Sequence, residues 1–225
     1  AGGRNGGSGA AMGGGSVSER IITHEDHVAE GAGWLAANTD HFARLLEITG
    51  PLPLRRTPDG FGQLASAIVS QQVSTASARA IRGRLEEAGL LRAETLALAD
   101  DESLRACGLS RQKMRYLRAL AQAGIDFGIL RDAPTDEVIA TLTAVTGIGV
   151  WTAEIYAMFA LGRADVFAPG DLALQEGARH LLGLEERPKE RSLREIAAQW
   201  SPWRAVAARG LWEYYHHVKG REGIL

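Results

Sequence analysis

Cysteine is almost missing from this sequence, because Cys107 is the only one among 225 residues. A single thiol forms no disulfide within its own chain and cannot hold a four-cysteine iron–sulfur cluster or a structural zinc ion. Cys107 and Gly108 stand at the expected end of a short helix. We therefore expect this cysteine to be a small buried side chain rather than a catalytic nucleophile.

Long apolar runs and a surplus of one charge are also missing. No apolar run reaches the roughly 20 residues of a membrane-spanning helix, so we expect no membrane segment and a cytoplasmic location. The formal net charge is −2, which gives no global sign of a nucleic-acid partner, although a local basic patch would suffice. Residues 1–18 are rich in glycine and serine and lack a hydrophobic signal core, which is typical of a flexible leader or a cloning remnant.

Alternating β-branched runs are scarce, whereas Ala, Leu, Glu, Arg and Gln dominate after residue 24, so the sequence predicts an all-α fold. Ser110 and Thr39-Asp40 are suitable helix N-caps, and Pro134 precedes another helix start. The predicted helices cover residues 24–37, 39–48, 61–71, 74–89, 93–99, 101–106, 111–127, 135–143, 150–161, 171–182, 190–199 and 203–219.

Residues 135–161 predict a helical hairpin with a tight turn at Gly147-Ile148-Gly149. Two glycines permit positive φ angles and the close approach of another chain. The free N–H groups at the start of the second helix, together with its dipole, can bind a phosphate without any side-chain charge. The alternative is a hairpin whose glycines only permit helix packing.

An aspartate follows the hairpin in the segment Pro169-Gly170-Asp171. Pro-Gly predicts a turn, which places Asp171 at a helix N-cap, a role worth about 1 kcal/mol. The alternative is a functional carboxylate at the mouth of a pocket beside the hairpin.

The string LTAVTGIGVWTA followed by DVFAPGD resembles the helix–hairpin–helix/Gly-Pro-Asp DNA glycosylases, although the order here is Pro-Gly-Asp. FGQLASAIVSQQVS at 61–74 resembles the helix and turn that face the lesion in that family. GLSRQKMRYL at 108–117 resembles the helix that follows. WSPWR at 200–204 and Leu211-Trp212 resemble the C-terminal part of AlkA-type 3-methyladenine DNA glycosylases. The likeness covers about residues 55–215.

The resemblance implies a monofunctional glycosylase that flips an alkylated purine out of double-stranded DNA and hydrolyses its bond to the sugar. Bifunctional members carry a lysine where this chain has Trp151, so no strand cleavage through a Schiff base is expected. Asp171 would stabilise the oxocarbenium-like sugar and orient or deprotonate the attacking water. One carboxylate suffices because alkylation already makes the base a good leaving group.

Trp151 and Trp212 would form the walls of the base pocket, since electron-rich rings attract a cationic base. For both tryptophans the alternative role is core packing. Ile155 and Glu213 replace aromatic residues of the best-known relatives, which puts the pocket shape in question.

The DNA contacts that the resemblance implies begin with the turn, Gly147, Ile148 and Gly149, and with Thr152. Gln72, with Gln71 beside it, would fill the gap left by the flipped base, unless both are only exposed residues at a helix end. Arg111, Lys113 and Arg163 are candidate phosphate contacts. The backbone carbonyls of Thr143, Val145 and Ile148 match those that hold a Na⁺ or K⁺ ion in the family, and no organic cofactor is expected.

The predicted domain organisation has two helical subdomains with a lesion-binding cleft between them. Residues 19–60 and 172–225 form a terminal lobe, and residues 61–171 form a central lobe that contains the hairpin. The expected protein is a monomer that acts on double-stranded DNA with alkylated bases. Two alternatives stay open: a glycosylase of the same fold for oxidised or deaminated bases, and a DNA-binding module without chemistry.

Overall fold

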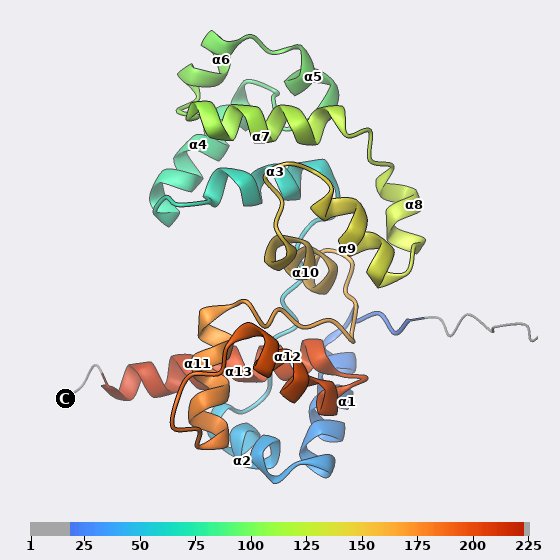
Figure 1. Ribbon diagram of the computed structural model, residues 1–225, viewed down its shortest axis with the longest axis vertical. Coiled ribbons are helices and arrows are strands. Elements are labelled where there is room, and N and C mark those ends of the chain that lie inside the picture. The colour runs from blue at the N-terminus through green and yellow to red at the C-terminus, as the bar shows by residue number, and fades with distance from the viewer. Residues whose placement is uncertain (1–18, 223–225) are drawn as a thin grey trace, which may run out of the picture.

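The computed structural model describes residues 19–222, and these residues form two stacked groups of helices (Figure 1). The predicted leader at residues 1–18 lies outside the described residues. The described segments are helical throughout apart from turns, loops and one isolated bridge between Ile21 and Arg163. The all-α prediction is therefore confirmed.

The lower group in Figure 1 joins helices from both ends of the described chain. A buried set of side chains that includes Phe42, Trp200 and Leu211 forms its core. Its helices are α1 (Glu25–Asn38), α2 (Asp40–Thr49), α11 (Leu172–Leu182), α12 (Glu190–Ala197), the short 3₁₀ helix η1 (Ala198–Trp200) and α13 (Arg204–Glu222).

The upper group consists of the middle of the chain and has a separate core that includes Leu64, Leu117 and Leu142. Cys107 is buried in this core, as the sequence predicts. Its helices are α3 (Phe61–Ser70), α4 (Thr75–Glu87), α5 (Ala93–Leu98), α6 (Asp101–Ala106), α7 (Arg111–Gln122), α8 (Phe127–Asp132), α9 (Thr135–Thr143) and α10 (Val150–Phe159).

Helix α10 contributes to both cores. Tyr156 and Ala157 belong to the upper core, whereas Met158 and Phe159 belong to the lower one. Glu154 on the same helix is buried and forms an ion pair with Arg194 of α12 at 2.9 Å. Burial raises the pKa of Glu154, and the hydrogen bond from Arg194 offsets part of that rise. The position of α10 is thus set by contacts with both groups of helices.

A fully buried arginine fixes the connection between α2 and α3. Arg209 of α13 donates to the carbonyls of Leu54 at 3.0 Å, Ala205 at 2.8 Å and Arg55 at 3.5 Å. Burial lowers the pKa of Arg209 to about 10. Three carbonyl acceptors satisfy a charge that would otherwise be costly to bury.

The structure corrects one predicted helix. The sequence predicts a continuous helix over 111–127, but α7 ends at Gln122 and a new short helix begins at Phe127. Gly124 has a φ of +63°, and the Asp126 carboxylate accepts the Ile129 N–H at 3.0 Å as an N-cap. A left-handed glycine followed by a capping aspartate ends one helix and starts another. No helix among residues 19–222 is long and apolar enough to cross a membrane.

Candidate active site

Asp171 is the N-cap of α11, as the Pro-Gly turn before it predicts. Its Oδ1 accepts the backbone N–H groups of Ala173 at 2.9 Å and Leu174 at 3.0 Å. These two bonds satisfy N–H groups at the start of the helix and fix the orientation of the carboxylate. The capping bonds engage Oδ1 alone.

Two tryptophans, which are 61 residues apart in the chain, also donate to this carboxylate. The indole N–H of Trp212 reaches Oδ1 at 3.2 Å, and that of Trp151 reaches Oδ2 at 3.1 Å. Trp212 is 8% exposed and packs against Phe159 in the lower core, whereas Trp151 is 47% exposed. Simple capping requires neither indole, so this convergence of Asp171 with both predicted tryptophans indicates a site rather than a helix end alone.

A cavity of about 170 Å³ lies beside Trp151, between α3 and α10. The predicted residues Gln71, Trp151, Thr152 and Ile155 line this cavity. Asp171, Trp212 and Glu213 do not line it. Asp171 is linked to it through the indole of Trp151, Trp212 donates to Asp171, and Glu213 forms an ion pair with Arg55. The complete lining consists of Gln63, Leu64, Ala67, Ser70, Gln71, Trp151, Thr152, Ile155 and Tyr156.

Tyr156 closes one side of this cavity through a network with the α2–α3 connection. Its hydroxyl donates to Asp59 Oδ1 and accepts the Gly60 N–H at 2.9 Å, and Asp59 pairs with Arg131 at 2.6 Å. Burial, with the hydrogen bond to Asp59, raises the pKa of Tyr156. The phenol therefore stays neutral at physiological pH and serves as a fixed wall.

The predicted hairpin turn joins α9 to α10. Gly147 has a φ of +100°, and a Cβ there would lie 2.3 Å from the ring of Tyr116. Gly149 differs from the expectation: its φ is −89°, and no heavy atom lies within 4 Å of the place that a Cβ would occupy. Of the two turn glycines, only Gly147 needs to be glycine for the fold, because only it combines a left-handed backbone with a close neighbour.

The hairpin is tied to the turn that follows α3. The side-chain amide of Gln71 donates to the Gly147 carbonyl at 2.9 Å. Gln72 follows as an exposed residue with a φ of +55°, which is uncommon for a residue other than glycine. The turn that carries both glutamines therefore lies beside the hairpin, with Gln72 projecting from it.

Two predicted phosphate contacts are wrong. Lys113 is 8% exposed and its ammonium donates to the Val69 carbonyl near the end of α3, where burial lowers its pKa. Arg163 is 6% exposed and donates to Glu19 and to the carbonyls of Arg131 and Ala133. Both cations hold protein segments together, so neither is available to DNA. Arg111, in contrast, is exposed.

Tyr116 is a residue of the site to which the sequence assigns no role. It packs under Gly147, accepts a hydrogen bond from Gln112 at 2.7 Å, and carries the guanidinium of Arg115 5.5 Å from its ring centre. Arg115 is exposed, which leaves a cation next to the hairpin. No local pattern signals this role, because the contact joins residues about 30 positions apart.

The predicted cation ligands lie in the same hairpin. Thr143 ends α9, and the carbonyl of Val145 accepts the Ile148 N–H at 3.0 Å. Ile148 itself is 5% exposed and packs in the upper core. No group of three or more metal-binding side chains occurs within residues 19–222, so any ion here would depend on backbone oxygens.

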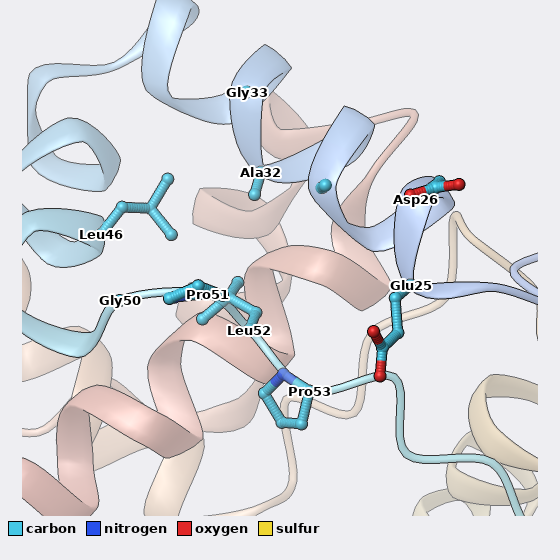
Figure 2. A pocket seen from close by; sticks show the side chains of 10 residues that line it. Glu25, Asp26, Ala32, Gly33, Leu46, Gly50, Pro51, Leu52 and Pro53 are labelled. Atoms are coloured by element: carbon cyan, nitrogen blue, oxygen red, sulfur yellow. The ribbon is translucent and has the colours of Figure 1, made fainter.

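A larger groove, of about 740 Å³, lies between α1, α2 and residues 50–53 (Figure 2). Its floor is apolar, with Leu46 and Leu52, and the carboxylates of Glu25 and Asp26 stand at its rim. Carboxylates repel phosphates, and the groove contains none of the predicted site residues. The smaller cavity that Trp151 lines, together with the Asp171 carboxylate to which Trp151 donates, is therefore the candidate active site.

The sequence that contains this site matches a known protein family. The family model described as HhH-GPD superfamily base excision DNA repair protein matches residues 65–202, which include the hairpin, Trp151 and Asp171. DNA-3-methyladenine glycosylase 1 of Schizosaccharomyces pombe is 29% identical over 192 residues, covering 80% of this chain and 84% of the relative. The probable bifunctional transcriptional activator/DNA repair enzyme AlkA of Mycobacterium tuberculosis is 33% identical, over 77% of this chain and 38% of the relative.

The solved structures that resemble this chain include DNA glycosylases with similar names. A DNA-3-methyladenine glycosidase from Bacillus halodurans has a TM-score of 0.77 and 36% identity, with 86% of this chain and 91% of that chain covered. The 3-methyladenine DNA glycosylase Mag1 of Schizosaccharomyces pombe, in complex with abasic DNA, has a TM-score of 0.70 and 28% identity. That match covers 82% of this chain and 95% of the other.

Proposed function

The chain belongs to the HhH-GPD superfamily of base excision DNA repair proteins, and we propose that it is a monofunctional glycosylase that removes alkylated purines of the 3-methyladenine type. The observation that carries this proposal is the Asp171 carboxylate, which accepts both tryptophan N–H groups beside a cavity that Trp151 lines. The names of the relatives support the substrate class.

Asp171 is proposed as the catalytic carboxylate. Within residues 19–222, Oδ1 accepts three N–H groups, whereas Oδ2 accepts only that of Trp151. Oδ2 is therefore the oxygen with a lone pair left for the reaction. It would stabilise the positive charge that develops on the sugar as the bond to the base breaks, and would orient the attacking water.

Trp151 is proposed to receive the extruded base. Its ring is half exposed and lines the cavity, and its N–H bond to Asp171 fixes the ring in place. A purine alkylated on a ring nitrogen is cationic, and an indole face attracts a cation by about 0.5–2 kcal/mol. The same residue thus places the base next to the carboxylate that acts on the sugar.

Strand cleavage through a Schiff base is not part of the proposal. That chemistry needs an amine at the position of Trp151, and an indole cannot supply one. The ammonium of Lys113, at the far side of α3, is bonded to the Val69 carbonyl and is buried. The proposed product is therefore an intact strand with an abasic site.

The hairpin is proposed to hold the DNA strand beside the cavity. The helix α10 begins at Val150 with exposed residues, which leaves its first N–H groups for a phosphate. Carbonyl oxygens suit a hard monovalent cation, and the Val145 carbonyl keeps a second lone pair beside its bond from Ile148. We propose that Thr143, Val145 and Ile148 would hold Na⁺ or K⁺, which would add positive charge at the strand.

Arg115 is proposed to replace Lys113 as a phosphate contact. The logarithm of DNA affinity falls as the logarithm of salt concentration rises. We expect Arg115→Ala to make this negative slope shallower by about one unit, because one phosphate contact is lost. Lys113→Met should leave this slope unchanged. The measurement is a salt titration of binding to a duplex that contains an abasic-site analogue. An equal decrease in the magnitude of the slope in both variants would contradict the assignment.

The function is tested by incubating the protein with DNA treated with a methylating agent. We expect release of free 3-methyladenine, strands that stay intact on a denaturing gel, and cleavage at the abasic sites only after alkali. Parallel duplexes carry 8-oxoguanine or uracil. Release from those duplexes alone would favour a glycosylase for oxidised or deaminated bases, and binding without any release would leave a DNA-binding module.

A further inference from the structure

Gln63 lines the candidate base cavity and has no role in the fold that would explain an amide at this position. It is the third residue of α3, and Ala67 and Ser70 line the cavity on the same helix at i+4 and i+7. Its side chain is partly buried. No hydrogen bond within residues 19–222 engages its side-chain amide, so both a donor and an acceptor remain open.

The other polar groups of the cavity are mostly occupied. The Ser70 hydroxyl donates to the Ser66 carbonyl at 2.8 Å, and the amide nitrogen of Gln71 donates to Gly147. The Tyr156 hydroxyl bonds to Asp59 and Gly60, and the Trp151 N–H bonds to Asp171. Thr152 can contribute one hydroxyl, and Gln71 keeps one N–H and its carbonyl oxygen, although its bond to Gly147 holds that amide against the hairpin. Gln63 is the lining residue whose amide has no bond to the protein within residues 19–222, so its donor and acceptor are both free to turn toward a base.

A planar amide with both groups open matches the polar edge of a purine. Glutamine pairs with adenine through two parallel hydrogen bonds, one accepted from the 6-amino group and one donated to a ring nitrogen. Such a pair is lost when an apolar side chain replaces the amide. Stacking on Trp151 recognises the charge of the base, whereas an amide recognises its pattern of donors and acceptors, so the two contacts are complementary.

We propose that Gln63 is a specificity residue that hydrogen-bonds to the polar edge of the extruded base. This inference rests on the proposed function, because it assumes that a base enters the cavity. In this role Gln63 touches the base and not the sugar. It therefore acts on the binding of the base and leaves the grip on the DNA strand unchanged.

The experiment compares Gln63→Leu, which has nearly the same size, with the unmodified protein in three assays. We expect release of 3-methyladenine from methylated DNA to fall at least about fivefold, as for a lost bidentate pair. The inhibition constant of free 3-methyladenine should rise by a similar factor. Affinity for a duplex with an abasic-site analogue should stay the same, because no base is present there.

Ser66→Ala is the matched control, because it also removes a polar group from α3, but one whose hydroxyl is already bonded to the Gly62 carbonyl at 2.7 Å and which lines no part of the cavity. This control should release 3-methyladenine at the unmodified rate. Equal release and equal inhibition in Gln63→Leu and the unmodified protein would overturn the inference. Absence of release by the unmodified protein would instead remove the proposed function.

Discussion

Replacing Asp171 with asparagine is expected to reduce base release from methylated duplex DNA by at least tenfold while the protein still folds and binds DNA. Asparagine is as good an N-cap as aspartate, so the capping role alone predicts almost no change in stability. It carries no negative charge, so it cannot stabilise a cationic sugar. The variant therefore separates the two interpretations of this residue.

The tryptophans add a second consequence of the same change. If the amide oxygen of the introduced asparagine stays on the helix N–H groups, its NH₂ group faces the indole N–H of Trp151, and two donors then meet. We expect Trp151 to lose its fixed orientation. A change in its fluorescence should accompany the loss of activity.

Asp126→Asn is the matched control for Asp171→Asn. Asp126 caps α8 through the Ile129 N–H at 3.0 Å and lines no part of the candidate site. The control should keep full activity. Measurements are single-turnover release rates, thermal unfolding and affinity for abasic-analogue DNA. Full release by the Asp171 variant would refute the catalytic assignment and leave only the cap.

The hairpin and the aspartate could be predicted from sequence because their signals are local. Gly147 and the Pro-Gly turn before Asp171 specify backbone geometry within a few residues, and backbone geometry is what these motifs use. The convergence of Trp151 and Trp212 on one carboxylate is suggested only by the family resemblance. No local rule brings residues 151 and 212 together.

The side-chain contacts that could not be predicted depend on long-range packing. Lysine is a residue type that usually lies at the surface, yet the end of α3 covers Lys113 and supplies the Val69 carbonyl as its acceptor. Arg163 is likewise enclosed by segments that contain Glu19 and Ala133. Gln63 lies within a mostly apolar stretch, and its place in the cavity emerges only when α10 is packed against α3. Sequence patterns report which residues are polar, but tertiary packing decides which polar groups are already satisfied.

The second large effect is expected at Gly147, where alanine should destabilise the fold. The φ of +100° disfavours any side chain, at a cost of about 1–2 kcal/mol. A Cβ would also lie 2.3 Å from the ring of Tyr116, which must then move. The Gln71 bond to the Gly147 carbonyl would be disturbed as well, so the hairpin and the glutamine turn would shift together.

Gly149→Asn is the contrasting variant, since it adds a larger side chain to the other glycine of the turn. Gly149 has an ordinary φ and open space around it, and it is the N-cap of α10, a position that asparagine favours. Thermal and urea unfolding should show no loss of stability at Gly149 and a clear loss at Gly147. DNA affinity should fall in both variants, because the hairpin is distorted in one and a side chain stands where the strand approaches in the other. A stable Gly147→Ala protein with normal affinity would mean that the turn can relax away from Tyr116 and that its close packing does not position the hairpin.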